Sequence, residues 1–159
     1  MKLDNVEVEI LLVEDSEKDI ELTLHALRAE NLGNQIEVAR DGEEALQFLA
    51  AQENELAAGR GVLPKLILLD LKLPKVDGLE VLRQIKSNPI TQFIPVVVLT
   101  CSKEDEDMVR SYELGVNSYL QKPVKFELFR AMVKDLGLYW LLINQLPTAA
   151  ALKKKARAV

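Results

Sequence analysis

Acidic, hydroxyl and amino side chains follow the apolar runs of this sequence, at the points where those runs end. They are Glu14-Asp15 after the first run, Asp70 at the end of the third, Thr100 and Ser102 at the fourth, and Lys122-Pro123 after the fifth. Carboxylates that are packed together repel one another and need a cation. Oxygen ligands without thiolate or imidazole groups beside them favour Mg2+. The sequence therefore predicts a Mg2+ site made of acids, next to a hydroxyl and an amine.

These residue types can together transfer a phosphoryl group. A carboxylate beside Mg2+ and a lysine ammonium can attack a phosphoryl donor, and the two cations then neutralise the charge on the transferred oxygens. The Thr100 hydroxyl can donate a hydrogen bond to the acyl phosphate that forms. Each group alone has a simpler interpretation: an acidic pair at a helix start for Glu14-Asp15, a capping residue for Asp70, a strand-end residue for Thr100, a surface lysine for Lys122. Their occurrence together favours the chemical interpretation.

Short apolar runs alternate with amphipathic stretches along the chain. Strands are expected at 8–13, 35–39, 66–70, 94–100 and 117–120. Helices are expected at 17 to about 30, in an extended stretch after Asp41-Gly42, and at 79–86, 103–114 and 126 to about 146. This alternation predicts an α/β fold with a parallel sheet covered by helices on both faces. Ligands of such sheets bind outside the carboxyl ends of the strands, so the chemical groups are expected at one edge.

The motifs that carry these groups resemble the receiver domains of bacterial two-component systems. They are Glu14-Asp15, LILLDLKLPKVDG (66–78), PVVVLTCS (95–102) and Lys122-Pro123, in the family's order. The resemblance runs from about residue 8 to about residue 145. It implies a flavodoxin-like (βα)5 fold, a doubly wound parallel five-stranded sheet in the order 2-1-3-4-5, with an extended C-terminal helix.

A narrower resemblance is to the small stand-alone response regulators of cyanobacterial phytochromes. It rests on LLDLKLPKVDGLEVL (68–82), SYELGVNSYLQKPV (111–124), the insertion before Pro64 and the ending YWLLINQLP (139–147). It implies a phytochrome-type histidine kinase as the phosphoryl donor.

The family's residue roles carry over to this sequence position by position. Asp70 resembles the phosphoacceptor, Asp15 a direct Mg2+ ligand, Glu14 an acid that acts on the ion through water, and Lys72 the residue that offers the ion its backbone carbonyl. Thr100 is similar to the switch hydroxyl, Tyr119 to the aromatic residue that turns inward on activation, and Lys122 to the phosphate-binding lysine. Pro123 follows a peptide bond that is cis in the family. Tyr119 also has an alternative interpretation as simple packing.

Three other residues are expected to be structural. Cys101 departs from the family pattern, which has Ala or Gly there, and is expected to be buried or half-buried. His25 lies within the first helix and is expected to be structural or exposed, and Asp77-Gly78 is expected to form a turn and a helix cap.

Two hypotheses for the function belong to different classes. In the first, the chain is a receiver that signals through altered protein contacts; it is a phosphoacceptor that assists its own phosphotransfer and dephosphorylation, not a small-molecule enzyme. Its domain is expected to span 1–147, with no output domain and a disordered tail at 148–159. The rival is an aspartyl-phosphate-type phosphatase or phosphotransferase. Such enzymes usually place the nucleophile on the first strand, beneath a cap, whereas Asp70 follows the third strand.

Composition limits the partners and the compartment. The net charge is −5 and the pI about 5.0, which argues against direct nucleic-acid binding. The single cysteine excludes an intrachain disulfide, and the start MKLDNVEVEI lacks the apolar stretch of a signal peptide. No apolar run reaches the roughly 20 residues of a membrane span. A cytoplasmic protein without a membrane segment is expected.

The segment 138–143, LYWLLI, is apolar on every side of the last helix. A surface helix should have a polar face. One interpretation is that this end folds back onto the domain. The other, which we favour, is a homodimer formed through the fourth helix, the fifth strand and the last helix, with Tyr119 on the same face.

Overall fold

The computed structural model describes residues 8–32, 35–123 and 125–158. Its centre is a five-stranded sheet with the order β2-β1-β3-β4-β5, in which every neighbouring pair is parallel. The strands are β1 (Ile10–Val13), β2 (Ile36–Ala39), β3 (Leu66–Leu69), β4 (Val96–Thr100) and β5 (Ser118–Gln121). This confirms the predicted fold class and the strand order that the family resemblance implied.

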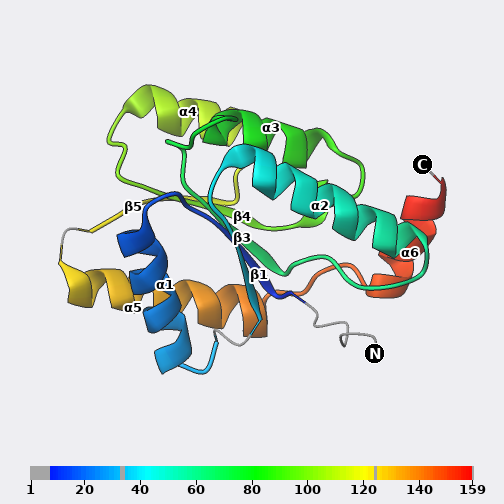
Figure 1. Ribbon diagram of the computed structural model, residues 1–159, viewed down its shortest axis with the longest axis horizontal. Helices are drawn as coiled ribbons and strands as arrows, with labels where there is room; N and C mark the ends of the chain where they lie inside the picture. Colours follow the sequence, from blue (N-terminus) through cyan, green and yellow to red (C-terminus); the bar gives the residue numbers. More distant parts are fainter. Residues whose placement is uncertain (1–7, 33–34, 124, 159) are drawn as a thin grey trace.

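Helices cover both faces of the sheet (Figure 1). Helices α1 (Glu17–Ala29) and α5 (Phe126–Gly137) pack together on one face. Helices α2 (Gly42–Ala57) and α3 (Gly78–Ser87) cover the other, with α4 (Asp105–Glu113) beside α3. A short 3-10 helix, η1 (Thr91–Phe93), precedes β4. The second helix is as extended as the sequence predicts. No helix within the described ranges is long and apolar enough to cross a membrane.

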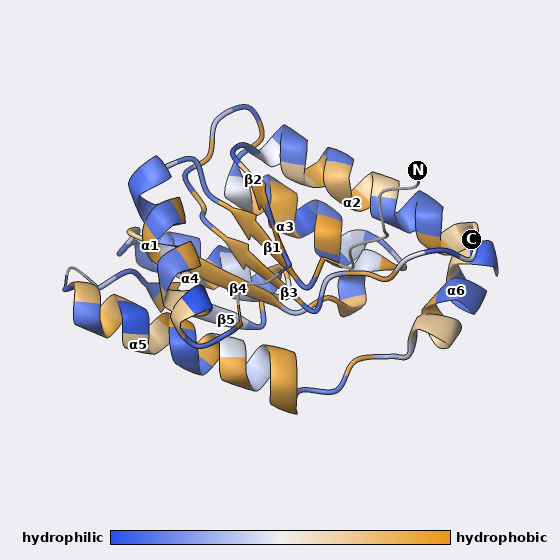
Figure 2. Cartoon of the chain, turned by 60° about the horizontal axis from the view of Figure 1, so that its bottom comes forward, coloured by the Kyte–Doolittle hydropathy of each residue, from blue (hydrophilic) through white to orange (hydrophobic). Residues whose placement is uncertain are grey.

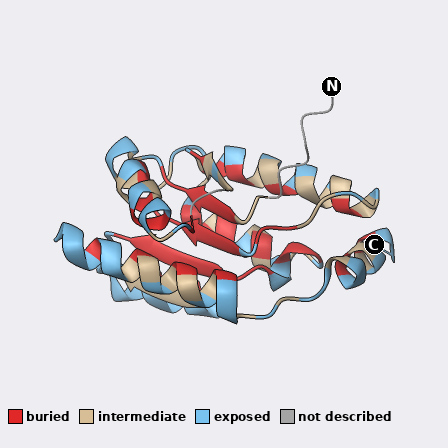
Figure 3. Cartoon of the chain, turned by 90° about the horizontal axis from the view of Figure 1, so that it is seen from below, coloured by how far each residue is buried: buried red, intermediate tan, exposed pale blue. Residues whose placement is uncertain are grey.

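The three central strands are apolar because both of their faces are covered. Every residue of β1, β3 and β4 is buried, and their sequences are ILLV, LILL and VVVLT. Figure 2 shows these strands as a continuous hydrophobic layer, and Figure 3 shows them as the buried layer between helices whose outer sides are exposed. Each large apolar side chain buried there contributes roughly 1.5–3 kcal/mol. The strand ends are therefore held rigidly.

Strands β1 to β4 are shorter than predicted, and β5 is shifted by one residue. Asp70 therefore lies in a loop, whereas Thr100 is the last residue of β4. Strand β3 ends at Leu69, so Asp70 is the first residue beyond it. Strand β4 begins at Val96, two residues later than expected, because Pro95 has no N–H to donate to the ladder. Residues 1–7, on which the signal-peptide prediction partly rests, lie outside the described part of the chain.

The predicted long last helix is present, and it changes from α-helical to π-helical geometry after Gly137. Helix α5 ends there, and a π-helical segment, η2 (Leu138–Ile143), follows and ends before Asn144. The wider π-helical turn changes which side chains face the domain. Leu141 is buried and Trp140 packs against the α1–α5 side of the core. Tyr139, Leu142 and Ile143 stay exposed, so the segment folds back in part only.

The tail expected to be disordered contains a helix, α6 (Ala149–Ala158), which packs against α2. Its sequence, AAALKKKARA, consists of strong helix formers. Leu152 and Ala156, one turn apart, are buried against the core. The Arg157 Nε donates to the Ala57 carbonyl at 3.3 Å, at the C-terminal end of α2 where a cation is favoured. The disorder prediction overlooked this apolar pair.

Candidate phosphorylation site

Two neighbouring strands bring three carboxylates together. Glu14 and Asp15 follow β1, Asp70 follows β3, and one oxygen of each lies within 4.8 Å of the others. Backbone bonds fix the loops: the Asp70 N–H donates to the Val13 carbonyl at 3.0 Å, and the Glu14 N–H to that of Ala39 at 3.0 Å. Glu14 and Asp70 are buried, whereas Asp15 is exposed. The predicted acidic cluster is therefore present and open to solvent on one side.

This carboxylate cluster fits a hard divalent cation. Its donors are oxygens only, and two of the three are taken out of water. Buried carboxylates at this spacing are mutually repulsive without a counter-charge. The exposed side at Asp15 leaves room for water or for a further ligand, which Mg2+ normally retains.

Lys122 lies at the centre of the acids. Its Nζ donates to Glu14 Oε2 at 2.6 Å, to Asp19 Oδ2 at 2.8 Å and to Asp70 Oδ2 at 3.2 Å. The side chain is 6% exposed. Burial lowers the pKa of the Lys122 ammonium, but the bonds to Asp19 and Glu14 and the charges of Asp70 and Glu14 outweigh it, so the pKa rises above its ordinary value. Lys122 is therefore a fixed cation beside the candidate phosphoacceptor.

The same surroundings disfavour the charged form of Glu14, whereas they favour the charged form of Lys122. Burial raises the pKa of its carboxyl group to about 7, and the nearby Asp70 charge adds to this, while the bond from Lys122 opposes it. The Ser16 N–H also donates to Glu14 Oε1 at 3.1 Å. A cation bound at the cluster would compete with the proton of the Glu14 carboxyl group.

The sequence prediction missed Asp19. It occupies the third position of α1, where an acid is ordinarily explained by capping and by the helix dipole. Ser16 is the N-cap, as predicted, and its Oγ accepts from the Asp19 N–H at 3.3 Å. The signal available in the sequence was the position of Asp19 one helical turn after the acidic pair, on a helix that begins at the sheet edge.

A second polar network lies beyond β4. Thr100 is fully buried, and its Oγ1 accepts from the Ser102 N–H at 3.3 Å. The Ser102 Oγ donates to Asp107 Oδ2 at 2.6 Å, and the half-buried Tyr119 donates its hydroxyl to the Ser102 carbonyl at 3.3 Å. Tyr119 thus contacts the loop that directly follows Thr100. The sequence prediction included Thr100 and Tyr119 but not the buried acid Asp107.

The loop after β3 borders both networks. The Lys72 N–H lies 3.5 Å from Asp70 Oδ1, and the Lys72 ammonium pairs with Asp107 at 3.5 Å. Gly78 closes the loop: a Cβ there would lie 2.4 Å from the Asp70 carbonyl oxygen. Asp77 precedes α3 as its N-cap residue but makes no side-chain cap bond. Asp77-Gly78 therefore forms the predicted turn at the start of α3, but the predicted cap is one of position only, without a side-chain hydrogen bond.

Three further expectations have mixed outcomes. Cys101 is exposed, not buried, because it lies past the end of β4. No peptide bond in the described stretches is cis, so the family's cis bond before Pro123 is not seen here. His25 is exposed on α1, with its ring centroid 6.3 Å from that of Phe126, as predicted.

Comparison with known proteins decides the family. The family described as response regulator receiver domain matches residues 10–134. This chain belongs to the response regulator receiver family. The receiver is similar to the response regulator Rcp1 of Synechocystis sp., at 44% identity over 140 residues, 88% of this chain and 93% of Rcp1. It is also similar to the probable methanogenesis regulatory protein FilR2 of Methanothrix harundinacea, at 46% identity over 141 residues, 89% of this chain and 88% of FilR2.

Solved structures agree with the assignment. The phosphorylated cyanobacterial phytochrome response regulator RcpA matches with a TM-score of 0.78 at 41% identity, over 89% of the receiver and 99% of RcpA. The Mn2+-bound form of Rcp1 matches with a TM-score of 0.77 at 44% identity, over 87% of the receiver and 98% of Rcp1. The receiver is therefore a two-component signalling protein, its family binds a divalent metal at this acidic pocket, and a histidine kinase is the partner that the family implies. The rival phosphatase hypothesis is not favoured.

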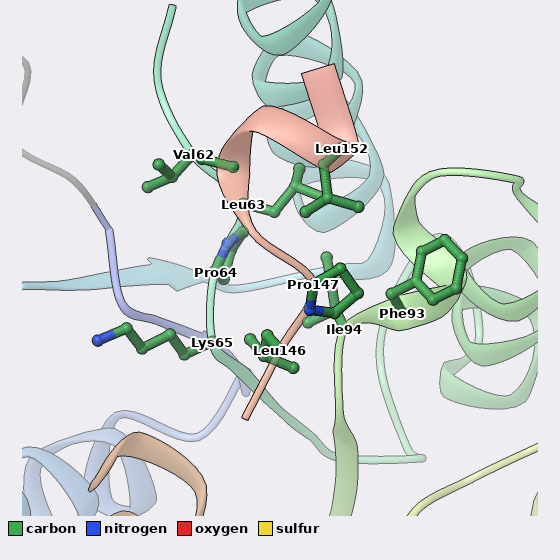
Figure 4. Close-up of a pocket in the computed structure, with 10 residues that line it drawn as sticks. Val62, Leu63, Pro64, Lys65, Phe93, Ile94, Leu146, Pro147 and Leu152 are labelled. Carbon is green, nitrogen blue, oxygen red and sulfur yellow. The ribbon is translucent and has the colours of Figure 1, made fainter. Parts of the chain in front are cut away.

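An apolar pocket of about 190 Å3 lies at the opposite end of the strands (Figure 4). Leu63 and Pro64 precede β3, Ile94 precedes β4, and Leu152 of α6 closes the other side. The Lys155 ammonium lies 4.6 Å from the Phe93 ring centroid nearby. Among the residues that the structure describes, no acid lines this pocket, so it is separate from the phosphorylation chemistry.

Proposed function

We propose that the receiver accepts a phosphoryl group on Asp70 from a histidine kinase, with Mg2+ at the adjoining acids. An Asp70 oxygen forms a bond to phosphorus while the bond from phosphorus to the kinase histidine breaks and the histidine leaves. The observation that supports this most strongly is Lys122, whose Nζ contacts both Glu14 and Asp70. One cation therefore already lies where negative charge must be neutralised during transfer.

The other residues divide the remaining tasks. Asp15, Asp70 and the Lys72 carbonyl would hold Mg2+ directly, and Glu14 would act on the ion through water. The ion supplies charge neutralisation of the phosphoryl oxygens. The Thr100 hydroxyl would donate a hydrogen bond to the aspartyl phosphate. Tyr119 would then turn inward and break the hydrogen bond that its hydroxyl donates to the Ser102 carbonyl. The same groups would assist the later hydrolysis by water.

A phytochrome-type sensor kinase is the proposed donor. RcpA is named as a phytochrome response regulator and matches the receiver over nearly its whole length. Because a histidine kinase uses ATP, we expect the receiver in the cytoplasm. We also expect no direct binding to nucleic acid, since the net charge is −5.

Phosphotransfer from purified kinases tests this function. A phytochrome kinase labelled on its histidine should transfer label to the receiver with Mg2+ and much more slowly with EDTA. A kinase from another sensor class is the control and should transfer more slowly at equal concentration. Equal transfer with and without Mg2+, or none from any kinase, would contradict the proposal.

We also propose that the receiver forms a homodimer through α4, β5 and the long helix made of α5 and η2. Large apolar side chains are exposed on these elements, and they are Met108, Val109 and Tyr112 on α4, Leu128 on α5, and Tyr139, Leu142 and Ile143 on η2. A second copy would cover Leu142 and Ile143, which are 65% and 64% exposed. A two-fold interface that includes β5 would connect Tyr119 to the partner and so to phosphorylation.

Sedimentation velocity over a concentration series tests the dimer. The Tyr139→Asp/Leu142→Asp variant should sediment as a monomer where wild type does not. Ala51→Asp, on the exposed side of α2, is the control and should sediment as wild type does. A wild-type monomer at high micromolar concentration, phosphorylated or not, would overturn this interface.

A further inference from the structure

The three hydrogens of the Lys122 ammonium are all engaged by carboxylates from separate elements. Glu14 follows β1, Asp70 follows β3, and Asp19 is on α1. A lysine has three donors and a flexible four-carbon stem, so its position depends on its partners. The position of Nζ relative to Asp70 is therefore set by its two shorter contacts, to Glu14 at 2.6 Å and to Asp19 at 2.8 Å.

Those two partners differ in their relation to the metal cluster. Glu14 belongs with Asp15 and Asp70 to the group of carboxylates that lie within 4.8 Å of one another, whereas Asp19 is outside it. A carboxylate that faces a divalent cation is drawn toward that cation and competes less for an ammonium. Asp19 is thus the partner of Lys122 that stays available when the cluster holds its ion.

The start of α1 holds Asp19 ready for this contact. In a capping box, an acid at the third helical position would bond the N–H of the N-cap residue. Here the Ser16 N–H donates to Glu14 Oε1 instead. The Asp19 backbone is fixed on both sides, by the Ser16 Oγ and by the Thr23 hydroxyl, which donates to the Asp19 carbonyl at 2.8 Å. The Asp19 carboxylate is therefore free of the helix and directed to Lys122.

We propose that Asp19 is a positioning residue for phosphorylation, which holds the Lys122 ammonium toward Asp70 while the acidic cluster is occupied by its cation. The inference rests on the proposed function and goes beyond it, because it concerns an acid that neither takes the phosphoryl group nor binds the metal. Without Asp19, Lys122 loses the one hydrogen-bond partner for which it does not compete with the metal ion. The ammonium that contacts the incoming phosphoryl group is then less well positioned.

Two binding measurements separate this role from metal binding. The Asp19→Asn variant keeps the size of the side chain and the backbone bonds, and Glu21→Gln, on the exposed side of the same helix, is the matched control. We expect Asp19→Asn to weaken binding of beryllofluoride, a phosphoryl mimic followed by 19F NMR with Mg2+, by about tenfold. Mn2+ affinity, followed by electron paramagnetic resonance, should stay within about twofold. Glu21→Gln should match wild type in both.

A double-mutant cycle shows whether Asp19 acts through Lys122. Asp19→Asn should slow phosphorylation by acetyl phosphate in the wild-type background and have little further effect in Lys122→Met. Unchanged beryllofluoride binding, an equal loss of Mn2+ affinity, or additive effects in the cycle would each overturn the inference. Failure of the proposed function would be seen separately, as wild type that neither labels on Asp70 nor binds beryllofluoride.

Discussion

Two lysines, Lys122 and Lys86, each use three hydrogen bonds in partly desolvated places, yet their surroundings act on them in opposite ways. The Lys122 Nζ donates to three carboxylates. The Lys86 Nζ donates to the carbonyls of Gln92 and Ile94 at 3.1 and 2.8 Å and to Asn117 Oδ1 at 3.0 Å. The pKa of Lys122 is raised, whereas burial lowers the pKa of Lys86 to about 8. Hydrogen-bond number alone therefore does not determine what a buried lysine does.

The difference lies in the charge and the place of the acceptors. The acceptors of Lys86 are neutral dipoles, which satisfy its donors but do not offset the loss of hydration of its charge. Through these bonds Lys86 connects α3 with η1 and with the segment before β5. The acceptors of Lys122 are carboxylates, which offset its loss of hydration and leave the cluster with excess negative charge for a metal. Lys86 thus has a structural role, and Lys122 a role in the phosphorylation chemistry.

The largest expected effect comes from removing the Lys122 ammonium. Lys122→Met should slow phosphorylation by acetyl phosphate by about 100-fold or more, because among the described residues no other lysine ammonium pairs with Asp70. The rate is measured by separating phosphorylated from unmodified chain over time with Mg2+. Lys86→Met is the matched control and should keep the wild-type rate. Equal rates in the two variants would remove the distinction between the lysines.

The metal side of the site should be nearly as sensitive. Asp15→Ala should weaken Mg2+ binding by more than about 100-fold, and Glu14→Ala by about 10-fold, since a direct ligand acts at contact distance and Glu14 is proposed to act through water. Isothermal titration calorimetry measures both, because Trp140 on η2 is a poor reporter. The same loss in both variants would show that the roles are misassigned.

The structural lysine should matter for stability. Lys86→Met should lower the free energy of unfolding by about 1–3 kcal/mol, because the Gln92 and Ile94 carbonyls and Asn117 lose a donor. Urea unfolding followed by circular dichroism measures this. An exposed lysine, Lys154→Met on α6, is the control and should change little. Wild-type stability for Lys86→Met would mean that the buried bonds contribute nothing.

The same lysine should also make stability depend on pH. The folded chain should release the Lys86 proton near pH 8, whereas the unfolded chain keeps it to about 10.5. Between these values the unfolded state binds more protons, so the stability of wild type should rise relative to Lys86→Met as pH increases from 7 to 10. Unfolding of both variants at several pH values tests the sign. A fall in that difference would indicate that the Lys86 charge is stabilised by its acceptors.

Sequence patterns predicted the parts of the molecule that depend on local signals. The apolar runs gave β1, β3 and β4, and the motif order located Glu14, Asp15 and Asp70 at one edge. Asp19 and Asp107 were missed because acids in a first helical turn have an ordinary local explanation. For Asp19 the partner, Lys122, is also distant in sequence and is brought to it by tertiary packing. The helix α6 was missed because its burial also depends on tertiary packing. Leu152 and Ala156 form only a short apolar pair in the sequence, and they are buried because α2 lies beside them.

The most direct test of the account is to locate the phosphoryl group. The receiver is incubated with acetyl phosphate and Mg2+, reduced with borohydride to trap the aspartyl phosphate, and mapped by tandem mass spectrometry. We expect the reduced residue at Asp70 alone in wild type and no incorporation in Asp70→Asn, with both chains folded by circular dichroism. Label at full yield on Asp70→Asn, or trapping at Asp15 or Asp19 in wild type, would contradict the central claim.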